Sequence, residues 1–162
     1  MIYTSSHDAF KTNKYITYAI SGNRGKDANY EGNCYPKLAP KLSFWKVWHD
    51  NIGIIPEKQN NEYYIRKYWE MVLSKLDVVK TYRELDNSVL LCYEKNIDFC
   101  HRHIVSAWFE IFLSVQVYEV KAHNSIIEFV EKPDYIKKYL YEIIKNIDLE
   151  KNDNIKILTK HK

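Results

Sequence analysis

The chain has 162 residues, a length that suits one domain with its own hydrophobic core. Its formal net charge is +3, and the 24 Lys and Arg residues are interleaved with 21 acidic residues, so the sequence lacks the concentrated basic stripe that nucleic-acid-binding proteins carry. No apolar stretch approaches the roughly 20 residues that span a bilayer. Neither nucleic acid nor a membrane is therefore an expected partner.

The cysteines and the N-terminal sequence favour a reducing compartment. Three cysteines cannot all pair, and Cys92 and Cys100 lie in or beside apolar sequence, where a reduced thiol is at home. The first ten residues, MIYTSSHDAF, lack the positive charge and the apolar run of a signal peptide. A soluble, cytoplasmic protein is expected.

The first predicted elements are two strands and a polar loop. A short strand over residues 2–4 ends in small hydroxyl residues, and His7 opens a possible helix. A stronger strand over residues 15–21 is rich in β-branched and aromatic residues and ends before Gly22. The loop that follows, residues 22–32, holds three of the four glycines but does not match the phosphate-binding loop, which also needs a Lys followed by Ser or Thr.

Helical periodicity dominates the middle of the chain. A helix is expected over residues 42–50, with Ser43 as its cap. The polar stretch PEKQNNE then reads as a break before a second helix that starts near Glu62, where apolar residues recur at a period near 3.6. A further short helix is expected over residues 78–85.

The second half of the chain again alternates strands with helices. Residues 88–93 (SVLLCY) form an almost continuously apolar stretch, as in a strand covered on both faces. A helix over residues 99–113 follows, with Asp98 as its N-cap, and then a strand over residues 116–121. The last expected elements are a helix that begins at Pro133 and a polar tail, residues 148–162, in which residues 154–158 could add an edge strand.

This alternation predicts an α/β protein with a single domain over residues 1–147. The expected fold is a small open, mostly parallel sheet of about four or five strands with helices on both faces, a Rossmann-like three-layer arrangement. Ligands of such sheets bind outside the carboxyl ends of the strands. That rule places residues 4–7, 21–25 and 94–102 on one rim.

The chemistry concentrates at the start of the helix after residue 98. A thiol in a first helical turn ionises more easily because free backbone amides and nearby cations favour the thiolate. The predicted catalytic residues are Cys100 as nucleophile, His101 as acid or base, and Glu94 as orienting group or proton acceptor. The predicted ligand-binding residues are Arg102, Thr4, Ser5, Ser6, Ser21 and Arg24.

Other interpretations of the same residues remain open. A buried cysteine is often only a small apolar side chain, and His or Arg near a helix start is often a surface residue. A tyrosine-phosphatase-type loop is disfavoured, because Ser106 occupies the position where that loop needs arginine. Zinc is a weaker candidate, since no second thiol pair has structural-site spacing, so no metal or cofactor is expected.

The run LLCYEKNIDFCHRHIVSAWF resembles the signature of the domain-of-unknown-function 488 family, in which a strand reading LLCxE is followed by CHR at a helix start. The matching residues are Cys92, Glu94, Cys100, His101 and Arg102. The resemblance extends over about residues 1–122 and implies an α/β fold with a Cys-His-Arg site at the carboxyl edge of the sheet. The first loop, NRGKDANYEG, departs from the arginine-then-proline arrangement usual in the family, so Arg24 matches it only in part. The family carries no established activity.

Two function classes fit these observations. The first is an enzyme that acts on a small anionic, nucleotide-like substrate through Cys100, His101 and Arg102. The second is a non-catalytic binding module that captures a nucleotide-like metabolite or a protein partner. The reaction, the oligomeric state and the identity of the ligand are left open by the sequence.

Overall fold

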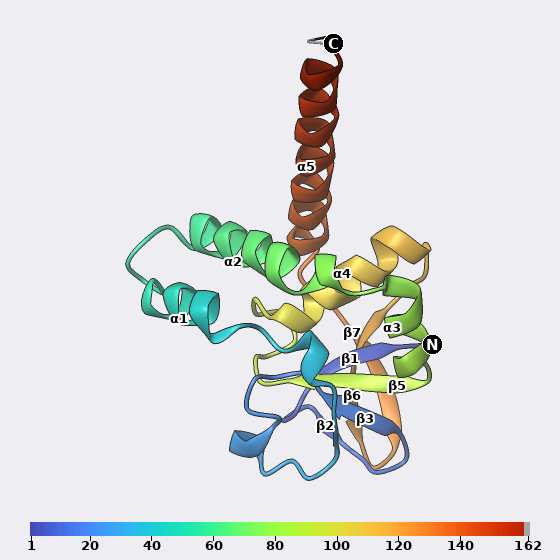
Figure 1. Cartoon of the computed structure of the whole chain (residues 1–162). Helices are drawn as coiled ribbons and strands as arrows, with labels where there is room; N and C mark the ends of the chain where they lie inside the picture. Colours follow the sequence, from blue (N-terminus) through green and yellow to red (C-terminus); the bar gives the residue numbers. More distant parts are fainter. Residues whose placement is uncertain (161–162) are drawn as a thin grey trace.

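The computed structural model describes the backbone of residues 1–160 and the side chains of residues 1–148. Within this part of the chain, seven strands form one sheet that is joined to five α-helices (Figure 1). The strands are β1 (Tyr3–Ser6), β2 (Phe10–Lys11), β3 (Ile16–Ala19), β4 (Asn33–Cys34), β5 (Ser88–Cys92), β6 (Tyr118–His123) and β7 (Ile126–Val130). The helices are α1 (Leu42–Asp50), α2 (Glu57–Met71), α3 (Val78–Leu85), α4 (His101–Leu113) and α5 (Tyr135–Lys160), with 3-10 helices η1 (Lys26–Ala28), η2 (Pro36–Leu38) and η3 (Leu73–Lys75).

The sheet is mostly parallel, as predicted. Five strands lie side by side in the order β4, β3, β5, β1 and β6. Strand β2 also pairs with β6, on the edge that β1 occupies but further along β6. Only β7 is antiparallel among the described strands, and it pairs with β6 through a turn at Asn124 and Ser125, which both have positive φ. The sheet has more strands than the four or five expected. Strands β2 and β4 have two residues each and are too short to show a sequence period, and β7, with five residues, was not predicted.

The two faces of the sheet are covered to different extents. The five α-helices lie on one face (Figure 1), where the main core joins Ile2 and Leu90 to residues of α2 and α4. The opposite face carries a smaller cluster that includes Phe10 and Leu91, and Tyr30, from the segment after η1, packs against it. The α/β class is thus confirmed, with helix α4 in the centre of the helical layer.

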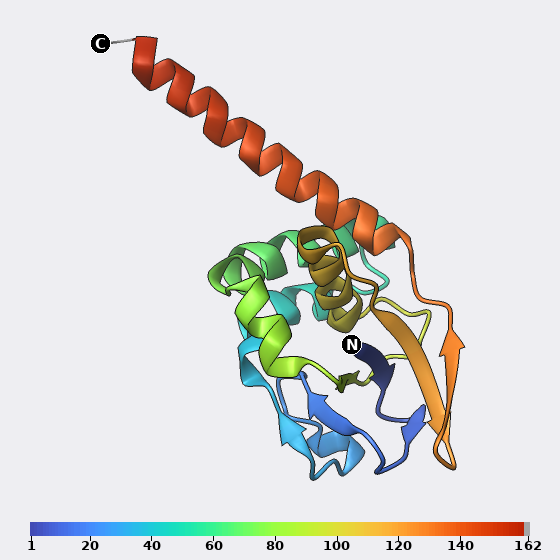
Figure 2. The ribbon, with the colours of Figure 1, turned by 90° about the vertical axis from the view of Figure 1, so that its right-hand side faces the viewer.

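Helix α5 extends further than predicted. Its first half packs on α2 and α4 through Ile136, Leu140 and Ile143, and its second half projects away from the rest of the molecule (Figure 2). The helix continues through residues 154–158, so this segment is helical and does not form the suggested edge strand. None of the described helices combines the length and the apolar composition needed to cross a membrane.

Two local predictions in the first third of the chain are wrong. The chain after His7 does not open a helix, because Ser6 closes a turn by accepting a hydrogen bond from the Ala9 amide at 3.2 Å. The carbonyl of Ala9 then accepts from the Ala122 amide at 2.9 Å and draws the chain into strand β2. Ser43 lies inside the first turn of α1, whose N-cap is Lys41.

Helix α2 begins at Glu57, five residues before the predicted start. The polar stretch that looked like a break is its first turn and a half, since Asn60 and Asn61 are buried against α1. The Asn60 amide donates to the Trp48 carbonyl at 2.8 Å, and the Trp48 indole donates to Asn61 at 3.0 Å. Buried amides that hydrogen-bond to Trp48 therefore stand where a search for helical periodicity expects apolar residues.

Candidate functional site

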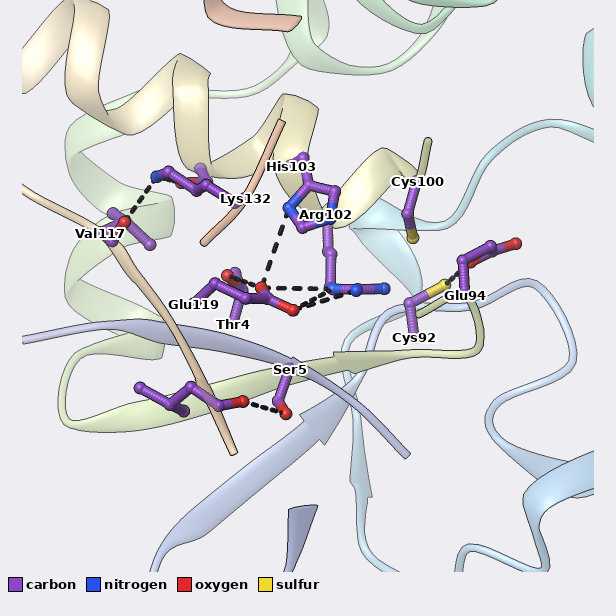
Figure 3. Close-up of polar contacts among 12 residues, drawn as sticks. Thr4, Ser5, Cys92, Glu94, Cys100, Arg102, His103, Val117, Glu119 and Lys132 are labelled. Carbon is purple, nitrogen blue, oxygen red and sulfur yellow. Dashed lines mark hydrogen bonds and ion pairs between the residues drawn. The ribbon is translucent and has the colours of Figure 1, made fainter. Parts of the chain in front are cut away.

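The candidate site lies where strand β5 gives way to helix α4 (Figure 3). Cys92 is the last residue of β5 and pairs with Ser6 at the end of β1. Cys100 is the N-cap of α4, with extended backbone, and not a residue of the first turn as expected. Asp98, the predicted cap, lies outside the helix, and the Cys100 side chain makes no capping hydrogen bond to the amides at the helix start.

Two thiols share one imidazole. The Nδ1 atom of His101 lies 3.6 Å from the Cys92 sulfur and 4.0 Å from the Cys100 sulfur. The other ring nitrogen, Nε2, lies 2.9 Å from the carbonyl oxygen of Ile20. Because a carbonyl can only accept, Nε2 carries a proton, and the lone pair of a neutral His101 ring points at the thiols.

The two cysteines have opposite ionisation preferences. Burial raises the pKa of the Cys100 thiol, but the Cys92 thiol, the Arg102 guanidinium and His101 outweigh it, so the pKa lies well below its usual value. Burial raises the pKa of Cys92, and the neighbouring Cys100 adds to the rise. Negative charge in this pair therefore resides on Cys100, the thiol at the helix start.

Glu94 and His101 complete a proton-exchanging group. Burial, together with the neighbouring Cys100, raises the pKa of Glu94 to about 7. Burial lowers the pKa of His101, but its contact with Cys100 and the charge of Glu94 outweigh that effect and leave the pKa above its usual value. The Cys92 thiol donates to a Glu94 carboxylate oxygen at 3.3 Å, which ties the acid to the thiol pair.

Arg102 is held by a partner that the sequence analysis missed. Its guanidinium donates to Glu119 of strand β6 from Nε at 3.1 Å and from Nη2 at 3.0 Å, and neither side chain is exposed. Thr4 donates to the same carboxylate at 2.6 Å. The Nη1 atom of Arg102 has no partner among the described residues, and the guanidinium extends toward Cys92 (Figure 3). Glu119 lies within the strand predicted over residues 116–121, and a charged residue inside a strand is the sequence feature that could have indicated a buried partner for Arg102.

A cavity of about 500 Å³ opens onto the thiol group. Cys92, Glu94, Cys100 and His101 line its polar side. Its remaining walls include Trp45 and Trp48 of α1, Tyr64 of α2, and Tyr93 and Phe99 of the loop between β5 and α4. Trp45 and Trp48 are three residues apart, so both lie on one face of α1.

The predicted ligand-binding residues separate into two groups. Ser21 lines the cavity, together with Gly22, Asn23 and Asp27 of the following loop. The other predicted residues do not line it. The Ser5 hydroxyl donates to the Val120 carbonyl, Ser6 closes the turn before β2, Thr4 and Arg102 bind Glu119, and Arg24 lies in the first loop.

The same atoms have the composition of a metal-binding group. The Cys92 and Cys100 sulfurs and a ring nitrogen of His101 all lie within 4.8 Å of one another. Thiolate and imidazole are ligands that zinc favours. His103 lies apart from this group: its buried ring makes no hydrogen bond among the described residues, and its Nδ1 lies 3.8 Å from a carboxylate oxygen of Glu119. Burial and Arg102 lower the pKa of His103 to about 3.

Comparison with known proteins gave one family match. The family model DUF488-N3a, described as the active DUF488-N3 subclade, matches residues 10–111, which is more than half of the chain and includes Cys92, Glu94, Cys100, His101 and Arg102. No curated protein matched the chain, and no solved structure did.

Proposed function

The chain belongs to the DUF488-N3a family, and from the residues at its cavity we propose that it is an enzyme in which Cys100 attacks a small, planar, nucleoside-like substrate. The observation that carries this proposal is the convergence of a thiol, an imidazole and a carboxyl group on one side of the cavity. Cys100 acts as nucleophile, and His101 and Glu94 exchange protons with the substrate.

The position of Cys100 supports its role as nucleophile. Cys100 is the N-cap of α4, next to the amides of the first turn, and its sulfur lies 4.0 Å from His101 Nδ1. The amides favour a thiolate, and the imidazole can hold the thiol proton. A purely structural cysteine needs neither group. A residue that acts in turnover needs both.

The cavity walls support a planar substrate. Trp45, Trp48 and Phe99 present aromatic rings on which a heterocycle can stack, and the Ser21 and Asn23 side chains offer hydrogen bonds at the rim. Among residues 1–148, whose side chains the structure describes, no lysine or arginine lines the cavity. A neutral base or nucleoside therefore fits better than the strongly anionic substrate that the sequence suggested.

The role of Arg102 changes accordingly. Its charge is balanced by Glu119 and its side chain is fully buried, so it does not clamp a ligand phosphate or carboxylate. Its positive charge still lies close enough to Cys100 to favour the thiolate. Arg102 is therefore a positioning residue, which acts on the substrate through Cys100.

Alkylation of the three cysteines tests the proposal. Metal-free protein is treated with iodoacetamide at pH 7, and the modified peptides are quantified by mass spectrometry. Cys100 should react faster than Cys34, although Cys100 is buried and Cys34 is half-exposed, and Cys92 should remain unmodified. The variant His101→Gln should slow the labelling of Cys100 and leave that of Cys34 unchanged.

A panel of purine and pyrimidine nucleosides then separates catalysis from binding. A nucleoside that protects Cys100 and is also converted supports the enzyme. Protection without conversion, together with slow labelling of Cys100 relative to Cys34, would contradict it and favour the binding module.

A further inference from the structure

The thiol pair and His101 have the spacing of a metal centre. In a tetrahedral zinc site with Zn–S bonds of 2.3 Å and Zn–N bonds of 2.0–2.1 Å, neighbouring ligand atoms lie about 3.5–3.8 Å apart. The measured separations from His101 Nδ1 are 3.6 Å to the Cys92 sulfur and 4.0 Å to the Cys100 sulfur. Shifts of a few tenths of an ångström would bring both contacts to that spacing.

We propose that Cys92, Cys100 and His101 bind one Zn²⁺ ion, with the fourth coordination position reachable from the cavity. All three ligands and Glu94 line the cavity, and Glu94 lies 3.3 Å from the Cys92 sulfur. Glu94 or a small molecule in the cavity can therefore occupy the fourth position. Three protein ligands and one exchangeable position are typical of zinc sites that take part in chemistry.

The surroundings of His101 fit a metal ligand. Metal-binding histidines generally donate their second ring N–H to a carbonyl or carboxylate, which fixes the ring and its tautomer. His101 makes this contact through Nε2 with the Ile20 carbonyl at 2.9 Å. The nitrogen left for the metal, Nδ1, is the one that faces both sulfurs.

Charge balance also favours a divalent cation. Two thiolates neutralise Zn²⁺, so the buried centre carries no net charge when His101 is neutral. The nearby Arg102 is already paired with Glu119 at 3.0 Å and requires no further anion. Thiolate ligands select Zn²⁺ over Mg²⁺ and Ca²⁺, which prefer oxygen.

The backbone holds the ligands in place before the metal arrives. Cys92 ends strand β5, and its carbonyl accepts from the His7 amide at 2.8 Å. Cys100 and His101 are the N-cap and first residue of α4. Ligands on a strand end and a helix start lose little freedom on binding, as a tight site requires.

Metal occupancy has a consequence for the site. When two Zn–S bonds form, Cys92 gives up its thiol proton and the Cys100–His101 pair gives up the proton that it shares, and both protons pass to solvent. A zinc-bound Cys100 sulfur is not available to attack a substrate, so zinc would hold the thiol in an inactive state. The inference does not depend on the proposed function, because the metal can bind whether or not Cys100 is a nucleophile.

Cobalt substitution tests the site directly. Chelator-treated full-length protein with Cys34→Ser, which removes the third thiol, is titrated with Co²⁺. One equivalent should produce a thiolate-to-cobalt charge-transfer band, and one equivalent of Zn²⁺ should abolish it. Absence of the band would overturn the proposal, whatever the reactivity of Cys100.

Variants assign the ligands. Adding Cys92→Ser or Cys100→Ser to the Cys34→Ser protein should weaken Zn²⁺ binding by more than the roughly 10- to 100-fold that loss of a hydrogen bond to a metal ligand costs. Affinity unchanged by either substitution would overturn the assignment. If a variant fails to fold by circular dichroism, the unsubstituted protein decides: Zn²⁺ should block alkylation of Cys100 but not of Cys34, and equal labelling with and without Zn²⁺ contradicts the site.

Discussion

Arg102 and Glu119 form a salt bridge of 3.0 Å in which neither side chain is exposed to solvent. The bridge joins helix α4, which begins at the candidate site, to strand β6. Burial raises the pKa of Glu119, and Arg102 and Thr4 oppose the rise by donating hydrogen bonds to its carboxylate. The charge that favours the Cys100 thiolate is thus anchored to the sheet by a partner 17 residues away in sequence.

The variant Glu119→Gln should destabilise the protein strongly. Removing one charge of a buried pair leaves the other uncompensated, which costs about 3–5 kcal/mol. The free energy of unfolding, measured in urea, should fall by this amount. The double variant Arg102→Leu with Glu119→Leu is the control, since replacing both charges by apolar residues should recover most of the loss. A fall of less than 1 kcal/mol in Glu119→Gln would contradict the prediction, because exposed pairs contribute about that much.

A second buried acidic residue, Glu110 of α4, should make the stability of the protein depend on pH. Glu110 accepts from Lys132 at 2.7 Å, from the Val117 amide at 3.1 Å and from Lys137 at 2.9 Å. Burial raises the pKa of Glu110, but these donors outweigh it and leave the pKa below its usual value of 4.5. A carboxyl group with a lowered pKa stabilises the fold above its unfolded pKa, and this contribution is lost as the pH falls through the folded pKa.

The variant Glu110→Gln should therefore lose stability at pH 7 and show a shallower decline under acid. Hydrogen bonds to a charged group contribute about 1.5–3 kcal/mol, which sets the expected loss at neutral pH. Urea unfolding at a series of pH values from 7 down through 4.5 gives the measurement. Glu142→Gln, an exposed acid on α5, is the matched control and should leave the curve unchanged. Parallel curves for Glu110→Gln and the unsubstituted protein would show that Glu110 does not contribute to the pH dependence.

The sequence predicted the fold and the polar side of the site, but not the cavity. Cys92, Glu94 and Cys100 are found together because the end of a parallel strand and the following helix start meet at one sheet edge, a rule that needs no tertiary information. The aromatic walls of the cavity depend on how α1 lies over that edge. The spacing of Trp45 and Trp48 places them on one helix face, but it does not distinguish residues that line a cavity from residues that pack in a core.

The rule that ligands bind at the carboxyl edge of a parallel sheet also predicts Thr4 and Ser5 as site residues, but both side chains hydrogen-bond to strand β6. Thr4 and Ser5 point to opposite faces of β1, as successive strand residues must, and each found a partner on strand β6. Such pairings depend on strand order, which places β6 beside β1 although more than 100 residues separate them. The same long-range pairing explains why Arg102 is bound to Glu119 and does not line the cavity.

Ligand binding should depend on Trp45 more than stability does. Trp45 lines the cavity, is 37% exposed and stacks on His49, so little of the core rests on it. Stacking of a base on an aromatic side chain contributes about 1–3 kcal/mol, so Trp45→Ala should weaken binding of a nucleoside that protects Cys100 by roughly 5- to 150-fold. Trp69→Ala, which removes a ring stacked on Phe112 outside the cavity lining, is the control and should leave affinity unchanged. Equal affinity of Trp45→Ala and the unsubstituted protein would remove the aromatic wall from the proposal.

Cys100 should be a position where stability and function conflict. It occupies the N-cap of α4 without a side-chain capping bond, whereas Asp77 caps α3 by accepting from the Lys80 amide at 2.9 Å. Serine is among the preferred N-caps, and replacing it by alanine typically costs about 1 kcal/mol. We therefore expect Cys100→Ser to be more stable than Cys100→Ala by about this amount, and at least as stable as the unsubstituted protein, while both variants lose the alkylation site. Urea unfolding of the three proteins under reducing, metal-free conditions gives the comparison. If Cys100→Ser were instead the less stable of the two, the thiol would be an apolar packing residue and its place at the helix start would need another explanation.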